Sequence, residues 1–413
     1  MFSARDKVEG FDLTGYRYVN SYDLQETWKN VRKDWQHSLH NICSRTGSFP
    51  PSLARYLIER FSGKKQKVLD PFSGKGTTPL EACLSGRIGI GNDLSPEAYV
   101  ITHAKVKCVS LERARAHIKK IQEQMNIEQS PRIVRKGINT FFHPKTLAQI
   151  LAIREILRSD NSDESFFLRA VMCGILHGSA ENSLSLPCSH SFSMSPRYVR
   201  KYAIRHRLKR PRRDVIACLT NKAEKVLVDG VPKVSGEAYM ENASKLPLED
   251  KSVDLIVTSP PYFDKQTYAW DNWLRLWFLG YDDYREIQKK LFQSESMPKF
   301  ELFMSDNLRE MYRVLRDDSA AFIVVGDVVL NNRKVVTAES IARISESIGF
   351  KVNRIVKDPI PRAHKYFMFT PVDKGVRVDR VVELHKGRVE ENQTALPWHG
   401  RLSASPTAVN STS

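Results

Sequence analysis

The chain has 413 residues, of which 41% are hydrophobic and 27% charged, a composition typical of a globular protein with a buried core. Its apolar runs are too short to cross a bilayer, and its first ten residues lack a secretory signal, so we expect a cytoplasmic protein. Lys and Arg outnumber Asp and Glu by 64 to 47, and the net charge of +17 favours a polyanionic partner over the alternative of a functionally neutral basic surface.

Short strands and helices alternate in the first hundred residues. The spacing of apolar residues predicts a helix over 53–61, a strand over 67–70, a helix over 77–84 and a second strand over 88–92. Strand, helix and strand in close succession indicate a parallel α/β sheet.

From about residue 110 the pattern becomes helical, with apolar periodicity over 111–125 and 166–176 and no convincing strand. The alternation then returns, with strands predicted over 253–257, 320–325, 350–357 and 376–384 and helices over 300–315 and 337–348. A helical block therefore looks inserted into an α/β domain. We predict an N-terminal segment with the first half of that domain (1–109), a basic helical insertion (110–235), the second half (236–387) and a disordered tail (388–413).

The six cysteines are scattered, with no Cys-x-x-Cys pair. This spacing argues against a zinc ribbon and a disulfide framework, so we expect reduced and mostly buried thiols. His177, His190 and His206 have no partners at metal-ligand spacing, and we predict no metal site.

The first motif is Val-Leu-Asp-Pro-Phe-Ser-Gly-Lys-Gly-Thr-Thr at 68–78, a strand that turns through glycines into a helix. Such a turn presents bare backbone N–H groups and a positive helix end, which suit a carboxylate or phosphate. Asp93, at the end of the next strand, can accept hydrogen bonds from both ribose hydroxyls of an adenosine-containing cofactor. A Walker loop is excluded because Gly76 follows Lys75, and the third glycine of a dinucleotide fingerprint is missing.

The second motif, Thr-Ser-Pro-Pro-Tyr at 258–262, ends a buried strand at its carboxyl end, where ligands bind in open parallel sheets. An exocyclic base amine is a poor nucleophile because its lone pair is delocalised into the ring. The Ser259 hydroxyl and a carbonyl of the proline turn would accept its hydrogens and favour the tetrahedral geometry that attacks a methyl sulfonium. Tyr262 could stack on a base that has left the duplex. Alone, this segment would more often be an ordinary Pro-Pro turn.

Together the two motifs resemble those of the DNA amino-methyltransferases, which act on cytosine N4 or adenine N6. The resemblance implies the class I methyltransferase fold, a Rossmann-like, mostly parallel doubly wound α/β sheet, here with a large helical insertion, and the cofactor S-adenosyl-L-methionine. It implies catalytic roles for Ser259, Pro260, Pro261 and Tyr262. With Asp93, it gives as cofactor-binding residues Asp70, Pro71, Phe72, Ser73, Gly74, Gly76, Thr77, Thr78 and Asn242.

Further segments share the resemblance and others depart from it. The run Ser-Phe-Pro-Pro at 48–51 looks like the family's additional cofactor-binding segment. Relatives usually carry Ser in place of Lys75, and many have Asp in place of Asn242, whose amide oxygen could still accept from the adenine amine. The order of the motifs, with the insertion between them, differs from the order usual for relatives with this cofactor signature.

Residues 197–213 hold nine Lys or Arg and no acid, interleaved with Tyr198 and Tyr202. Such a segment can neutralise phosphates while its aromatic rings stack on unpaired bases. We expect nucleic-acid contacts from Arg197, Arg200, Lys201, Arg205, Arg207, Lys209 and Arg210, with a solvated basic helix as the alternative. Trp270, Trp273 and Trp277 share one helical face, for which packing is favoured over base stacking.

The sequence thus predicts a DNA methyltransferase that acts on a base flipped out of the duplex, by direct attack of the amine on the cofactor methyl. Ser259 favours cytosine N4 over adenine N6. The rival interpretations are a methyltransferase for an RNA base amine and an inactive nucleic-acid-binding relative. A separately acting restriction endonuclease is a possible partner.

Overall fold

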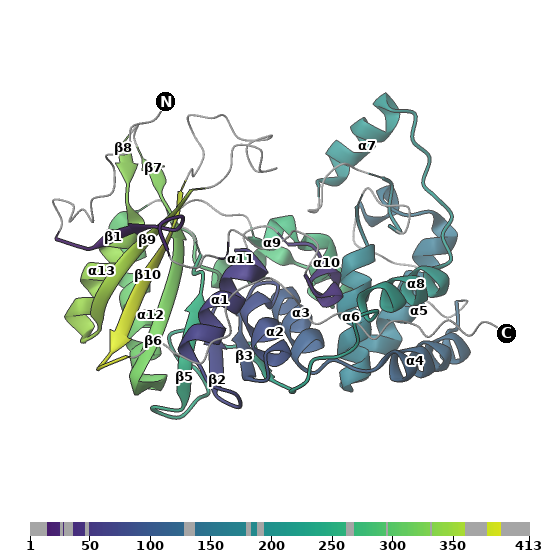
Figure 1. Ribbon diagram of the computed structural model, residues 1–413. Helices are drawn as coiled ribbons and strands as arrows, with labels where there is room; N and C mark the ends of the chain where they lie inside the picture. Colours follow the sequence, from purple (N-terminus) through teal and green to yellow (C-terminus); the bar gives the residue numbers. More distant parts are fainter. Residues whose placement is uncertain are drawn as a thin grey trace, which may run out of the picture.

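The computed structural model describes residues 15–24, 28, 36–45, 49–127, 137–178, 183–187, 194–261, 268–294, 296–330, 333–359 and 378–389. The predictions made for Ser48, His190, Tyr262 and residues 390–413 lie outside these ranges. An eight-stranded sheet forms one side of the molecule, and most of the helices between residues 111 and 226 lie beyond α2 and α3 on the other side (Figure 1).

The strand order of the sheet is β1-β9-β10-β6-β5-β2-β3-β4. Its strands are β1 (Tyr18–Asn20), β2 (Lys67–Asp70), β3 (Ile88–Asn92), β4 (Glu237–Tyr239), β5 (Val253–Thr258), β6 (Leu315–Gly326), β9 (Lys351–Pro359) and β10 (Val378–Lys386). Strand β10 runs antiparallel to β6 and β9, and the other neighbouring pairs are parallel. Strands β7 (Val328–Leu330) and β8 (Arg333–Val335) form a separate antiparallel pair.

The direction of winding changes at β2, which lies between β3 and β5. The chain first builds outward from β2 to β3 and β4, and it then returns to the other side of β2 to build β5 and β6. This is a topological switch point, the place where open parallel sheets bind ligands. The predicted fold class, a mostly parallel doubly wound α/β sheet, is therefore confirmed.

Alternating residues of the central strands face opposite sides of the sheet, as the two-residue period of a strand requires. Leu69, Ile256 and Ile323 pack in one core with helices α12 (Met297–Val314) and α13 (Thr337–Ile348). Their neighbours Val68 and Val257 pack in another core with α1 (Pro51–Phe61). Helices thus cover both faces, which explains why these strands read as continuous apolar runs.

The other helices are α2 (Thr77–Leu84), α3 (Pro96–Val106), α4 (Leu111–Gln124), α5 (Pro144–Arg158), α6 (Asp163–Ile175), α7 (Pro196–Arg205), α8 (Val215–Val226), α9 (Tyr268–Asp271), α10 (Trp273–Phe278) and α11 (Tyr284–Lys290), with short 3-10 turns at Ser38–Asn41 and Ile138–Thr140. Helix α7 stands clear of the remaining helices at the upper right of Figure 1.

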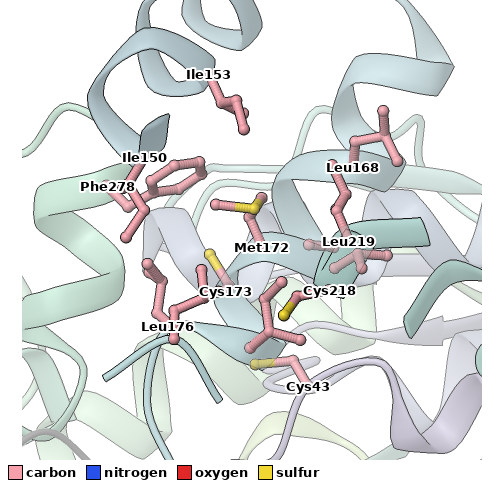
Figure 2. Close-up of a cluster of buried hydrophobic side chains, with 14 of the residues drawn as sticks. Cys43, Ile150, Ile153, Leu168, Met172, Cys173, Leu176, Cys218, Leu219 and Phe278 are labelled. Carbon is pink, nitrogen blue, oxygen red and sulfur yellow. The ribbon is translucent and has the colours of Figure 1, made fainter. Parts of the chain in front are cut away.

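The helices between residues 111 and 226 share one hydrophobic core with the sheet-covering helix α3. Ile101 and Ala104 of α3 belong to the same cluster as Leu168 and Met172 of α6. Figure 2 shows Leu168 and Met172 beside Leu219 of α8. The helical block is therefore joined to the α/β domain through packed side chains as well as through the chain.

Several sequence predictions concern this core. Trp273 and Trp277 are 2% and 1% exposed and belong to it, which confirms packing as their role. Among the described cysteines, Cys43, Cys83, Cys173 and Cys218 are buried free thiols and Cys108 is half-buried. No helix within the described ranges is long and apolar enough to span a membrane.

Candidate active site

A pocket of about 330 Å³ lies at the carboxyl ends of β2, β3 and β5. Eight of the residues assigned from the sequence line it, namely Pro71, Phe72, Gly74, Asp93, Asn242, Ser259, Pro260 and Pro261. The lining also includes residues that the sequence did not reveal: Arg45, Leu94, Glu241, Ala243, Ser244, Tyr268, Lys290, Leu291, Phe292, Phe303, Asp306 and Asn307. The two motifs therefore meet at one cavity, although their serines, Ser73 and Ser259, are 186 positions apart in the sequence.

The last residue of β5 is tied to the last residue of β2. The Thr258 hydroxyl donates a hydrogen bond of 2.6 Å to Asp70 Oδ1, which also accepts from the backbone N–H of Phe72 at 3.1 Å. Thr78 adds a second link, since its hydroxyl donates to the Val257 carbonyl at 3.0 Å. Burial raises the pKa of Asp70 to about 7, against the opposing effect of these hydrogen bonds. These contacts fix the start of the Ser-Pro-Pro segment at 259–261 relative to the glycine turn after β2.

The glycine turn differs from the sequence prediction in one respect. Several of its amides are used within the turn: Ser73 N donates to the Asn92 carbonyl at 2.9 Å, Gly74 N to Asp93 Oδ2 at 2.8 Å, and Gly76 N to the Ser73 carbonyl at 2.7 Å. The expectation that these N–H groups are bare was wrong, because the chain closes on itself and on Asp93.

Five of the assigned cofactor residues are not among those that line the pocket: Asp70, Ser73, Gly76, Thr77 and Thr78. All five are buried, and Gly76 has a φ of +71° at the start of α2. In the structure these residues shape the turn behind the pocket wall.

Asp93 lies in the pocket wall with both carboxylate oxygens engaged. Oδ2 accepts from Gly74 N, and Oδ1 accepts from Ser95 N at 2.9 Å. A carboxylate has about four lone-pair sites, so capacity remains for ribose hydroxyls. Asn242 is exposed, and its Oδ1 accepts from Ser244 N at 3.1 Å, which leaves the amide hydrogens and one lone pair for a ligand.

Arg45 joins three parts of the pocket and was missed by sequence reasoning. Its Nη2 donates to Glu97 Oε1 at 3.3 Å, and its Nη1 lies 3.9 Å from Asp93 Oδ2. The guanidinium lies 5.7 Å from the ring centroid of Tyr268. It also packs on Gly74, where an added Cβ would lie 2.8 Å from Nη1. The absence of a side chain at Gly74 therefore makes room for Arg45, a relation that no local sequence signal shows.

An aromatic wall forms a further part of the pocket lining. Phe303 of α12 stacks on Phe292 with a centroid distance of 4.2 Å and an interplanar angle of 22°, and it contacts Phe72 at 5.9 Å. Asp306 and Asn307, one turn further along α12, add polar groups to the lining. Such a wall suits the flat face of an adenine or a target base.

Ser259, Pro260 and Pro261 follow β5 directly and line the same pocket. Pro260 is buried, whereas Ser259 and Pro261 are half-buried. The structure thus places the serine at the cavity, with the rigid proline pair behind it.

The seven basic residues assigned to nucleic-acid contact lie elsewhere, on α7 and the segment after it. All seven are exposed, and none lines the active-site pocket: Arg197, Arg200, Lys201, Arg205, Arg207, Lys209 and Arg210. Tyr198 and Tyr202 of α7 stack on each other with centroids 6.0 Å apart.

The strand order, with its single antiparallel strand β10, and the pocket at the switch point define a class I methyltransferase fold. A model of the N6 and N4 methyltransferase family, which is described as DNA methylase, matches residues 4–104 and 253–388 of this chain. The match covers more than half of the chain. The chain belongs to this family. The match leaves out residues 105–252, which include α4 to α8.

Curated relatives are type II methyltransferases. The chain is 32% identical to M.BsoBI of Geobacillus stearothermophilus over 94 residues, 22% of this chain and 18% of that protein. It is 33% identical to M.MjaI of Methanocaldococcus jannaschii over 95 residues (22% and 31%), and 23% identical to M.MjaII of the same organism over 133 residues (26% and 25%). The matches thus span less than a third of each relative.

Similar solved structures include TrmN from Thermus thermophilus, with 13% identity, 84% of this chain and 52% of that chain covered, and a TM-score of 0.33. An S-adenosylmethionine-dependent methyltransferase from Methanosarcina mazei has 10% identity, 79% and 95% coverage, and a TM-score of 0.32. The class I methyltransferase fold is therefore assigned from the strand order of the sheet and not from these similarities.

S-adenosyl-L-methionine is the cofactor of this family, and the pocket fits it. Asp93 offers acceptors for a ribose, Leu94 and the aromatic wall offer apolar surface for an adenine, and Ser259 lies in the same cavity. When bound, S-adenosyl-L-methionine supplies an electrophilic methyl group.

Proposed function

We propose that this protein transfers a methyl group from S-adenosyl-L-methionine to the exocyclic amine of a DNA base. The observation that carries the proposal is the pocket shared by the two motifs, which Asp93 and Ser259 both line, together with the Thr258 to Asp70 hydrogen bond between the strands that lead into the motifs. A cofactor site alone would not require the serine at its wall.

In this proposal the Ser259 hydroxyl and a carbonyl of the proline turn accept hydrogen bonds from the target amine. These contacts localise the nitrogen lone pair, because they favour a tetrahedral nitrogen over the planar one. The rigid proline pair holds both acceptors in place, so little ordering is left for the reaction itself. As the nitrogen gains the methyl group it loses one hydrogen as a proton, which passes to solvent.

The substrate base has to leave the duplex to reach a pocket at the end of β5, so we propose a flipped base. We further propose cytosine N4 as the target, supported by the neutral serine at the head of the catalytic segment. Adenine N6 is the alternative within the same family. We also propose that the helical block at 110–235 contributes target recognition, supported by its exposed basic residues.

The test is to incubate the protein with labelled S-adenosyl-L-methionine and either duplex DNA or RNA, and to identify the modified nucleoside by mass spectrometry. The proposal expects N4-methylcytosine in DNA. N6-methyladenine in DNA would overturn the base assignment, and label in RNA alone would overturn the DNA assignment.

The matched variants are Ser259→Ala at the pocket and Ser252→Ala at the opposite end of β5, where the hydroxyl donates only to the Glu249 carbonyl. We expect methyl transfer to fall in the first variant and to persist in the second. Absence of transfer by the wild type, with cofactor binding retained, would support the inactive relative instead. A restriction endonuclease partner and a cytoplasmic location remain predictions from the sequence.

A further inference from the structure

A second hollow, of about 950 Å³, lies at the base of α7, away from the active-site pocket. Five of its lining residues are cations on α7 and the segment after it: Arg200, Arg207, Lys209, Arg210 and Arg212. Asn139 and Thr140 contribute polar groups from the facing 3-10 turn. No Asp or Glu is among the described residues that line it.

The hollow exists because the chain reverses at Arg207. This residue has a φ of +50°, a left-handed backbone conformation that residues other than Gly, Asn and Asp rarely adopt. Leu208 N then donates back to the Ala203 carbonyl at 2.9 Å, which closes the end of α7. The basic segment after the helix consequently lies on the same hollow as Arg200. Strain of this kind persists where the surrounding structure enforces it.

Arg210 anchors this segment. Its guanidinium donates to the carbonyls of Asn139 at 2.5 Å and Phe142 at 3.3 Å. Thr146 fixes the next part, since its hydroxyl donates to the Arg213 carbonyl and accepts from Arg213 N, both at 2.9 Å. The backbone that carries the free cations is therefore held on α5 and the 3-10 turn.

The other four lining cations, Arg200, Arg207, Lys209 and Arg212, are exposed, and none takes part in a salt bridge that the described part of the chain shows. Neighbouring cations on a fixed backbone repel one another, and a bound polyanion relieves that repulsion. Because the backbone of the segment after α7 is held in place, the cations that it carries are positioned before a ligand arrives. This lowers the ordering cost of binding.

We propose that this hollow binds the phosphate backbone of duplex DNA, with Arg200, Arg207 and Arg212 as the contacting cations and Arg210 as the residue that holds the segment in place. The proposal rests on the proposed function for its partner, DNA. It changes one sequence assignment, because Arg210 becomes an anchor and no longer a contact. It also places a DNA contact outside the active-site pocket, on the helical block.

The experiment measures the affinity of the full chain for a fluorescent DNA duplex at several salt concentrations. Each phosphate contact contributes about 0.9 to the slope of log K against log salt. We expect Arg200→Gln, Arg207→Gln and Arg212→Gln each to reduce the slope by about 0.9, and the triple variant by roughly 2.7. Lys119→Gln, a change at an exposed lysine of α4, serves as control and should leave the slope unchanged.

Two further measurements separate the alternatives. Arg210→Gln should lower the melting temperature more than Arg207→Gln does, since the Arg210 guanidinium donates to the Asn139 and Phe142 carbonyls. Binding of S-adenosylhomocysteine should be the same in all variants, because the hollow is not part of the pocket. A folded triple variant with the wild-type slope would overturn the inference, as would a slope change seen with RNA duplexes but not with DNA.

The failure of this inference is distinguishable from failure of the proposed function. If the wild type methylates DNA but the triple variant keeps its salt slope, only the hollow is refuted. If the wild type binds DNA with the expected slope and methylates no nucleic acid, the hollow stands and the proposed function fails.

Discussion

The Thr258 hydroxyl lies 2.6 Å from Asp70 Oδ1, and this one hydrogen bond connects the ends of two neighbouring parallel strands that are 188 residues apart in sequence. Both residues are buried, with exposed fractions of 0% and 2%. Each strand end leads directly into one of the two motifs. The bond therefore sets the position of Ser259, the serine proposed to be catalytic, relative to the glycine turn after β2.

The first prediction concerns this bond. Thr258→Val keeps the shape of the side chain and removes the donor, so the buried Asp70 loses one of its partners. We expect the free energy of unfolding to fall by about 1–3 kcal/mol and methyl transfer to fall with it. Thr258→Ser, which keeps a hydroxyl, is the control and should recover much of both. Urea unfolding and a labelled-methyl assay measure the two effects, and equal behaviour of Val and Ser would contradict the role given to the hydroxyl.

The second prediction is a pH dependence. Burial raises the pKa of Asp70 from 3.8 to about 7, so the folded state holds this proton more tightly than the unfolded state does. The stabilising contribution is complete below about pH 4 and is lost as the pH rises through 7. Without cofactor, we expect the wild type to lose up to roughly 4 kcal/mol relative to Asp70→Asn between pH 4 and pH 8. Denaturant unfolding of both proteins across this range checks it, and parallel curves would refute the raised pKa.

The third prediction separates acceptor chemistry from packing at Ser259. Ser259→Ala removes an acceptor from the pocket wall, and we expect kcat to fall by about 100-fold with little change in cofactor affinity. Ser259→Asp restores an acceptor and should retain more activity than the alanine variant. The measurement is kcat for each variant at saturating DNA. A loss of cofactor binding in both variants would instead give Ser259 a structural role.

The fourth prediction concerns Arg45, which we expect to hold Asp93 in position. Arg45→Gln should weaken S-adenosylhomocysteine and 5′-methylthioadenosine by the same factor, about tenfold, because both carry the ribose. Arg87→Gln is the matched control. Arg87 is also a buried arginine, but it lies just before the amino end of β3, where it donates to the Ser62 carbonyl. Calorimetry measures both ligands.

Two results would revise the role of Arg45. A loss confined to S-adenosylhomocysteine would show direct contact with the amino-acid part, which methylthioadenosine lacks. Because Arg45→Gln leaves Glu97 buried without its cation, the double variant with Glu97→Gln tests binding in a protein without that unpaired charge.

The central strands were predictable because buried parallel strands are short apolar runs, and β2 and β3 have the predicted bounds. The short edge strand β1 was not predicted, since its pairing of Tyr18 with Ile355 depends on a distant part of the chain. β6 begins earlier than expected because Leu315 pairs with Val253.

The motif residues at the pocket were likewise predictable, because a strand end fixes where its following residues lie. Arg45 and the aromatic wall of Phe292 and Phe303 were not, since they reach the pocket from segments whose sequence carries no local signal. The prediction of bare amides in the glycine turn was wrong for a similar reason. The acceptor for the Gly74 N–H is Asp93, which follows the next strand.

The core shared by α3 and α6 has a consequence for protein engineering. A chimera that exchanges only the segment at 111–226 for that of another protein would set an unmatched apolar surface against Ile101 and Ala104. Grafting a new segment would therefore require the outward face of α3 to be exchanged with it.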